Sequence, residues 1–210
     1  MLTLDTIIPL FSQGDWFIII DLQDAYFHIS IHPSHQKYLR FHYNTVYQFC
    51  ALPFGLSTAP RTFTKCMAPN AAFLRLQSVN FQPPIDNCLI ILTSYLDAIA
   101  ARDTTLHTLQ RLGLNINLAK SHLQPCQTVT FIGAELNSLQ ARAFLPQERI
   151  LKINRAITPF QPKKSAHHAQ HLLDLMASTT SVIQHAKLKM RALQAWILSL
   201  FDSMTDSPST

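Results

Sequence analysis

Carboxylates stand at two positions where a fold could hold metal ions in this 210-residue chain. Asp21 and Asp24 follow the apolar run Trp16-Phe-Ile-Ile-Ile20, and Asp86, with Asn87 after it, stands between two further apolar segments. A carboxylate at a strand end and another on a neighbouring hairpin suit two-metal phosphoryl transfer, because two Mg²⁺ ions need oxygen ligands on rigid elements. Aspartate is also common at strand ends and turns, so position alone leaves a purely structural role open.

The pattern of apolar residues predicts the elements that would position these carboxylates. We expect strands at 16–20, 79–82, 88–92, 129–132 and 134–137, a hairpin around Asn44-Thr45, and helices at 58–77, 94–112, from 146, 165–177 and 180–201. Pro69 lies inside the first long helix, where it removes a backbone donor, so a kink or break is expected. The order predicts an α+β fold with a mixed part over 1–145, a helical part over 146–204 and a polar tail over 205–210.

Charge is distributed unevenly along the chain. Residues 1–60 carry four Asp against one Lys and one Arg, a balance of −2, whereas 142–191 carry nine Lys or Arg against two acidic residues, a balance of +7. Such a gradient suits a protein that gathers carboxylates in one region and binds a polyanion with another. A solvated helical face would give the same basic region.

Cysteine usage and hydropathy indicate the compartment. The four cysteines, Cys50, Cys66, Cys88 and Cys126, form no CxxC pair, which favours free thiols in an intracellular protein, cytoplasmic or nuclear. The densest apolar stretch ends at Asp21, far short of the ~20 residues that span a bilayer. The N-terminus has no basic residue before its apolar patch, so neither secretion nor membrane insertion is expected.

Longer motifs carry a resemblance to a known family. Four segments resemble, in order and spacing, motifs A, B, D and E of the reverse transcriptases: Asp21-Leu-Gln-Asp-Ala-Tyr-Phe-His-Ile29, Leu52-Pro-Phe-Gly-Leu-Ser-Thr-Ala-Pro-Arg-Thr-Phe63, Asn117-Leu-Ala-Lys-Ser121 and Val129-Thr-Phe-Ile-Gly133. Leu145-Pro-Gln-Glu-Arg-Ile150 and Leu175-Met-Ala-Ser178 look most similar to the tyrosine-recombinase (DIRS-type) retrotransposons. The resemblance implies a palm, an antiparallel sheet with packed helices, over 1–145 and a thumb- or connection-like region over 146–204.

The resemblance also implies catalytic roles. Asp21 matches the motif A carboxylate that contacts both catalytic metals, Asp86 the first aspartate of motif C, and Asn87 stands as a degenerate third ligand for the two Mg²⁺ ions. Lys120 resembles the motif D lysine proposed to protonate the leaving pyrophosphate. The implied chemistry is attack of a primer 3′-hydroxyl on the α-phosphorus of a deoxynucleotide.

Other matching positions would bind substrates. Tyr26 occupies the position whose ring packs against the sugar of the incoming nucleotide and selects deoxynucleotides, and Phe54 and Gly55 open the loop along the nascent base pair. The residues that would hold the primer end are Phe131, Ile132 and Gly133. The partners implied are an RNA or DNA template-primer and deoxynucleotides.

Three departures from the family pattern predict impaired catalysis. Motif C, Tyr-x-Asp-Asp in the family, here reads Pro84-Ile-Asp-Asn87, which removes one negative charge and one backbone N–H. Pro69 interrupts the motif B helix. Motif A also begins about twenty residues from Met1 and nothing after Asp202 resembles a ribonuclease H domain, so we expect a truncated domain that lacks most of the fingers.

The sequence therefore predicts an RNA-directed DNA polymerase domain of retrotransposon origin, impaired in catalysis. The alternative is a non-catalytic nucleic-acid-binding remnant whose basic 142–191 region contacts phosphates. A fragment that folds poorly is a third reading.

Overall fold

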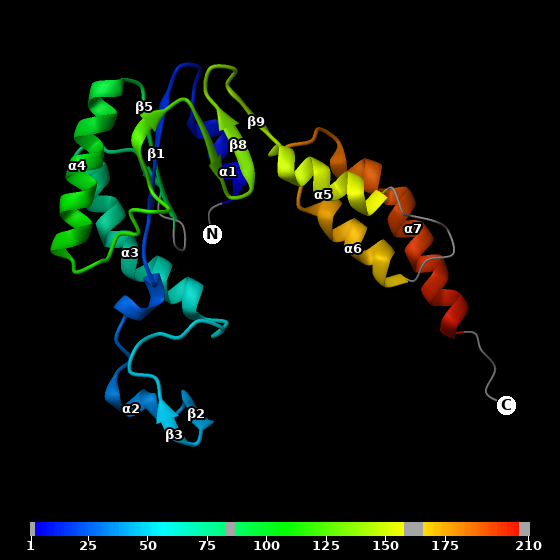
Figure 1. Ribbon diagram of the computed structural model, residues 1–210, viewed down its shortest axis with the longest axis horizontal. Coiled ribbons are helices and arrows are strands. Elements are labelled where there is room, and N and C mark those ends of the chain that lie inside the picture. The colour runs from blue at the N-terminus through cyan, green and yellow to red at the C-terminus, as the bar shows by residue number, and fades with distance from the viewer. Residues whose placement is uncertain (1–2, 83–86, 158–165, 206–210) are drawn as a thin grey trace. The chain divides into compact units, whose positions relative to one another are not determined.

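A computed structural model describes residues 3–82, 87–157 and 166–205 (Figure 1). The chain divides into two compact units, 1–129 with 138–141 and 130–137 with 142–210. The first unit is an α+β domain, and the second combines short strands with three helices.

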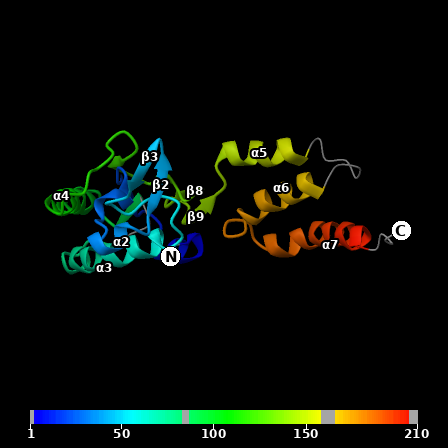
Figure 2. The same ribbon diagram turned by 90° about the horizontal axis from the view of Figure 1, so that it is seen from below.

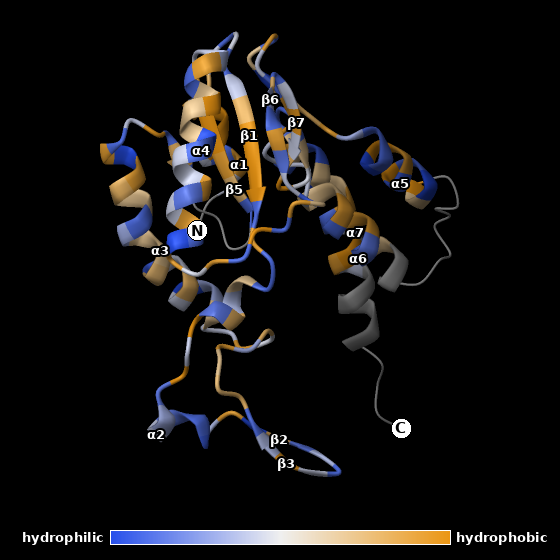
Figure 3. Cartoon of the chain, turned by 60° about the vertical axis from the view of Figure 1, so that its left-hand side comes forward, coloured by the Kyte–Doolittle hydropathy of each residue, from blue (hydrophilic) through white to orange (hydrophobic). Residues whose placement is uncertain are grey.

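A four-stranded antiparallel sheet forms the centre of the first unit. Its strands lie in the order β4 (Phe81–Gln82), β5 (Asn87–Leu92), β1 (Trp16–Asp21) and β6 (His122–Cys126). Ile18 and Ile20 belong to the core cluster that includes residues of the two long helices, whereas Phe17 alternates to the other face and meets Phe11 with ring centroids 5.2 Å apart. Because β1 is covered on both faces, its sequence is an unbroken apolar run, and Figure 3 shows this strand as strongly hydrophobic.

Helices α3 (Ala59–Leu76) and α4 (Tyr95–Arg111) pack against one face of this sheet. They bury Phe63, Leu74 and Leu109 completely or nearly so. The prediction of a break at Pro69 is wrong: α3 is one continuous helix that contains this residue. Pro69 is exposed, so water can satisfy the carbonyl that loses its hydrogen bond.

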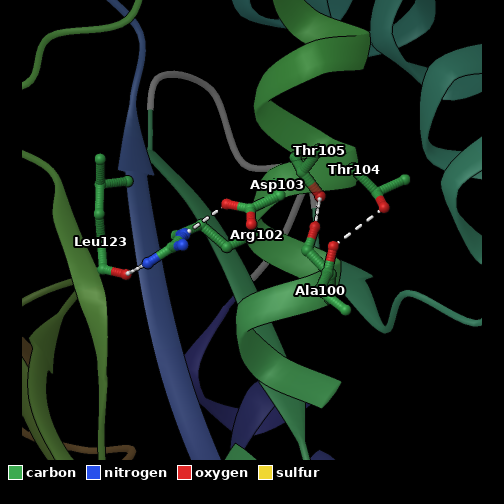
Figure 4. A network of polar contacts seen from close by, with 7 residues as sticks. Ala100, Arg102, Asp103, Thr104, Thr105 and Leu123 are labelled. Carbon is green, nitrogen blue, oxygen red and sulfur yellow. Dashed lines mark hydrogen bonds and ion pairs between the residues drawn. The ribbon is translucent and has the colours of Figure 1, made fainter. Parts of the chain in front are cut away.

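Polar contacts along α4 hold it beside β6 (Figure 4). The guanidinium of Arg102 pairs with Asp103 at 2.8 Å and donates from Nη1 to the carbonyl of Leu123 on β6 at 3.4 Å. The hydrogen bond that Arg102 donates to the carboxylate of Asp103 raises the pKa of Arg102 above its ordinary value. The hydroxyl of Thr104 donates to the carbonyl of Ala100 within the helix at 2.9 Å.

A hairpin follows the motif A segment, residues 21–29, and extends from the first unit at the lower end of Figure 1. It consists of β2 (Arg40–Tyr43) and β3 (Thr45–Gln48), preceded by the short helix α2 (Pro33–Gln36). Asn44 forms the tip with φ +59°, a conformation that asparagine tolerates. The hairpin predicted around this residue is confirmed.

Three short strands form a further sheet, and three helices follow them (Figures 1 and 2). The strands are β7 (Thr128–Phe131), β8 (Ala134–Asn137) and β9 (Arg142–Phe144), and the helices are α5 (Gln147–Ile157), α6 (Ala166–Ala177) and α7 (Ala186–Thr205). The helix expected from 180 begins only at Ala186, because His185 before it has φ +58° and cannot start an α-helical turn. The hydroxyls of Thr179 and Thr180 bond to carbonyls of α6.

The short N-terminal helices complete the first unit. They are α1 (Leu4–Ile7) and the 3₁₀ turn η1 (Ile8–Leu10), while η2 (Ala25–His28) follows β1. Among the helices of the described ranges, none has the length and apolarity needed to cross a bilayer.

Candidate active site

Asp21 lies at the end of β1 and is buried, with 8% of its surface exposed. The antiparallel register places it opposite Asn87, the first residue of β5. Directly opposed residues of such a pair have Cα atoms roughly 4.5–5.5 Å apart, so the motif A carboxylate and the motif C asparagine are neighbours. Asp86, the other predicted metal ligand, lies outside the described residues.

The loop after α4 is bonded to this end of β1. The backbone N–H of Asn117 donates to the carbonyl of Asp21 at 2.9 Å, and the N–H of Asp21 donates to Oγ of Ser121 at 2.9 Å. Lys120 lies between these two loop residues, so the bonds bring motif D beside motif A although about 100 residues separate them in sequence.

A polar cavity of about 450 Å³ opens where these segments meet. Its lining consists of Asp21, Leu22, Gln23, Asp24, Ala25, Phe54, Asn117 and Lys120. Carboxylate oxygens in the cavity suit a divalent cation, and a lysine beside them suits a phosphate. The family motifs predict no role for Gln23 or for the side chain of Asn117. Both residues nevertheless lie within motif segments, Gln23 in motif A and Asn117 at the start of motif D.

The donor set is suited to Mg²⁺ in type and sparse in number. Asp21 and Asp24 are oxygen donors on one cavity, and Asn87 is the register partner of Asp21. Over the described ranges, no three His, Cys, Asp or Glu side chains gather closely enough to hold a metal ion. Mg²⁺ characteristically uses one or two carboxylates and keeps several waters, so these residues fit the ion but would hold it weakly.

Aromatic rings form one side of the site. Tyr26 is buried, and its ring lies 4.8 Å from the ring of Phe54 and 5.7 Å from that of Phe63 on α3, measured between centroids. Phe54 is 56% exposed and lines the cavity. Gly55 after it has φ +85°, and a Cβ built there meets no atom within 4 Å. The positive φ, rather than a lack of space for a side chain, therefore explains why glycine occupies position 55.

The predicted primer-binding residues form the turn between β7 and β8. Ile132 and Gly133 both have positive φ, +46° and +73°, as the central residues of a type I′ hairpin turn do. Phe131 is buried, whereas Ile132 is 45% exposed at the tip. Nη1 of Arg149 donates to the carbonyl of Gly133 at 2.9 Å. This turn belongs to the second unit, while the Asp21 cavity belongs to the first.

Ile132→Asn is expected to stabilise the β7–β8 hairpin. A β-branched residue in the left-handed region is strained by roughly 1–2 kcal/mol, and asparagine is favoured before glycine in this turn. We expect the free energy of local opening, measured by native-state hydrogen exchange of the β8 amides, to rise by about 1 kcal/mol. Ile132→Val keeps the branched Cβ and should give no gain; an equal gain from valine would contradict the strain.

The profile of the family described as reverse transcriptase (RNA-dependent DNA polymerase) matches residues 8–136, more than half of the chain. Similar curated proteins include the Gag-Pol polyproteins of woolly monkey sarcoma virus, 25% identical over 162 residues, and walleye dermal sarcoma virus, 26% identical over 167 residues. These matches cover 71% and 77% of this chain and 9% of each polyprotein.

Solved structures show the same fold. A foamy viral protease–reverse transcriptase in complex with double-stranded DNA matches with a TM-score of 0.79 and 16% identity, covering 95% of this chain and 33% of that one. The same kind of protein with an RNA/DNA hybrid matches with a TM-score of 0.78 and 18% identity, covering 95% of this chain and 26% of that one. The predicted α+β palm is thereby confirmed, and the chain belongs to the reverse transcriptase (RNA-dependent DNA polymerase) family.

Proposed function

We propose that this chain is a reverse transcriptase domain whose Asp21 cavity performs template-directed nucleotidyl transfer, at a rate limited by a weak metal site. The primer 3′-hydroxyl would attack the α-phosphorus of a deoxynucleotide, and pyrophosphate would leave. The observation that carries this proposal is the convergence of Asp21, Phe54 and Lys120, from three separate family motifs, on one cavity. The relatives with double-stranded DNA and an RNA/DNA hybrid support a template-primer as partner.

The cavity residues divide the chemistry among them. Bound divalent ions would supply charge neutralisation at the attacking and leaving oxygens. Asp21 and Asp24 would hold these ions, with Asn87 opposite Asp21; the contribution of Asp86 rests on its motif position alone. The ammonium of Lys120 would donate a proton to the leaving pyrophosphate.

Substrate contacts follow from the aromatic side of the site. The ring of Tyr26 is held between Phe54 and Phe63, and a ring fixed in this way would leave no room for a ribose 2′-hydroxyl. Phe54 and Gly55 would lie along the nascent base pair. The turn Phe131, Ile132 and Gly133 would contact the primer end.

The finer affiliation is a separate part of the proposal. We propose that the chain comes from a tyrosine-recombinase retrotransposon, because the amino-acid sequences of the segments 145–150 and 175–178 resemble those elements. An intracellular site of action, in cytoplasm or nucleus, is supported by four cysteines without a CxxC pair. The non-catalytic alternative differs in one respect: nucleic-acid binding would persist while incorporation was absent.

Lys120→Gln tests the proposed proton donor. In single-nucleotide incorporation on a primed RNA template, we expect the rate at saturating nucleotide to fall about 100-fold, because general acid catalysis contributes ~10²–10⁴-fold. The apparent affinity for template-primer should stay within a factor of two, and Lys65→Gln, an exposed lysine on α3, serves as a matched control. An unchanged rate in Lys120→Gln would remove Lys120 from the mechanism.

A further inference from the structure

The side chain of Ser121 joins the loop that carries Lys120 to the strand that carries Asp21. Its Oγ accepts the N–H of Asp21 at 2.9 Å and donates to the carbonyl of Asn117 at 2.7 Å. The N–H of Asn117 in turn donates to the carbonyl of Asp21 at 2.9 Å. These three bonds close a ring between β1 and the loop, and we call this ring the Ser121 latch.

The Ser121 latch fixes the backbone on both sides of Lys120. Oδ1 of Asn117 also accepts the N–H of Lys120, at 3.3 Å. Asp21 is buried and Ser121 is half-buried, whereas Lys120 is exposed and lines the cavity. The main chain at Lys120 is therefore constrained while its side chain faces the cavity that Asp21 also lines.

A second set of bonds holds the other end of the loop. The N–H of Asn115 donates to Nε2 of His28 at 3.1 Å, and the carbonyl of Asn115 accepts the N–H of Gln23 at 2.9 Å. These contacts do not involve Ser121. Loss of the Ser121 hydroxyl should therefore leave the loop attached at Asn115. It should also keep the backbone bonds from the N–H groups of Lys120 and Ser121 to the carbonyl of Asn117, at 3.2 and 3.0 Å. What is lost is the link between the side chain of residue 121 and β1, the strand that carries Asp21.

We propose that Ser121 is a positioning residue for nucleotidyl transfer, which sets the place of the Lys120 ammonium relative to the Asp21 carboxylate. This inference rests on the proposed function of the cavity. Ser121 does not itself contact the reacting atoms. Its effect on the reaction must therefore pass through Lys120, which makes the proposal testable by a double-mutant cycle.

The cycle combines Ser121→Ala with Lys120→Gln in the single-nucleotide assay. Ser121→Ala should lower the saturating rate about tenfold with the KM for nucleotide within a factor of two, because a misplaced proton donor affects the transition state more than binding. In the Lys120→Gln background the same change should cost less than twofold. Ser121→Thr retains a hydroxyl and should restore most of the rate. A tenfold cost in both backgrounds would overturn the proposal.

One further variant and one further measurement separate positioning from general loss of structure. Thr104→Ala removes a hydroxyl that bonds to a carbonyl within α4 and should leave the rate unchanged. Hydrogen exchange of the Asp21 and Asn117 amides should accelerate at least tenfold in Ser121→Ala and not in Ser121→Thr. If the unmodified chain incorporates no nucleotide, the proposed function fails, and the exchange measurement still decides the latch: unchanged exchange in Ser121→Ala would refute it.

Discussion

Asn87→Asp is expected to raise the affinity of the Asp21 cavity for Mg²⁺ at least tenfold. Asn87 lies opposite Asp21 in the register of β1 and β5, so the change places another carboxylate directly beside that of Asp21. A divalent cation gains a charged ligand in place of a neutral amide, and a tenfold gain requires only ~1.4 kcal/mol. The amide is thus expected to weaken the site, because it offers a neutral ligand where a carboxylate would bring a negative charge.

Stability measurements reveal this gain without relying on catalysis. Without metal, two opposed carboxylates repel, so Asn87→Asp should unfold at lower urea concentration than the unmodified chain. Added Mg²⁺ should reverse the difference, since a ligand at 100 times its Kd stabilises the folded state by about 2.7 kcal/mol. The measurement is urea denaturation across a Mg²⁺ series.

Two controls isolate the site. Asn44→Asp makes the same chemical change at the tip of the β2–β3 hairpin, where the residue is exposed, and should show no dependence on Mg²⁺. Adding Asp21→Asn to Asn87→Asp should remove the dependence again. A Mg²⁺ response that survives the loss of Asp21 would mean that the ion binds elsewhere.

Tyr26→Ala is expected to cost about 3–5 kcal/mol of the free energy of unfolding of the first unit. Its side chain is buried between Phe54 and Phe63, and large-to-small changes of buried aromatic residues leave a cavity of this cost. Phe27 is the matched control, because it is adjacent in sequence and also contacts Phe54, with ring centroids 5.3 Å apart, yet is 47% exposed. Phe27→Ala should cost less than about 1 kcal/mol.

A more conservative substitution at Tyr26 tests whether its ring selects the sugar of the incoming nucleotide. Tyr26→Val removes the ring and leaves part of the buried volume filled, so a folded variant is expected to accept ribonucleotides. We expect discrimination between deoxynucleotide and ribonucleotide, measured as a ratio of kcat/KM, to fall at least tenfold. Undiminished discrimination in this variant would show that Tyr26 packs the core without selecting the sugar.

Most elements of the first unit could be predicted from local sequence. Local preferences explain three of its features: the apolar run of β1, Asn44 at the hairpin tip, and Gly113, which follows α4 with φ +75°. The start of α7 could not be predicted, because the left-handed backbone of His185 is not encoded by its residue type alone. The positive φ of Ile132 contradicts its residue type more strongly, since a β-branched residue is disfavoured at this position of the turn.

The residues of the candidate site could be predicted from the sequence, but the contacts between them could not. Family motifs named Asp21, Lys120 and Phe54, and the structure gathers all three around one cavity. The Ser121 hydroxyl was not assigned a role, because its partner Asp21 lies 100 residues away and no local pattern reports such a bond. Long-range hydrogen bonds depend on the packing of the whole unit, which a linear motif does not describe.

The most direct test of the account is the rate of single-nucleotide incorporation on a primed RNA template at low millimolar Mg²⁺. Three proteins are compared: the unmodified chain, Asn87→Asp, and Asn87→Asp combined with Asp21→Asn. We predict slow incorporation by the first, at least tenfold faster incorporation by the second and none by the third. Equal rates for the first two would contradict a site limited by Asn87, and incorporation by the third would contradict the assignment of the Asp21 cavity as the polymerase site.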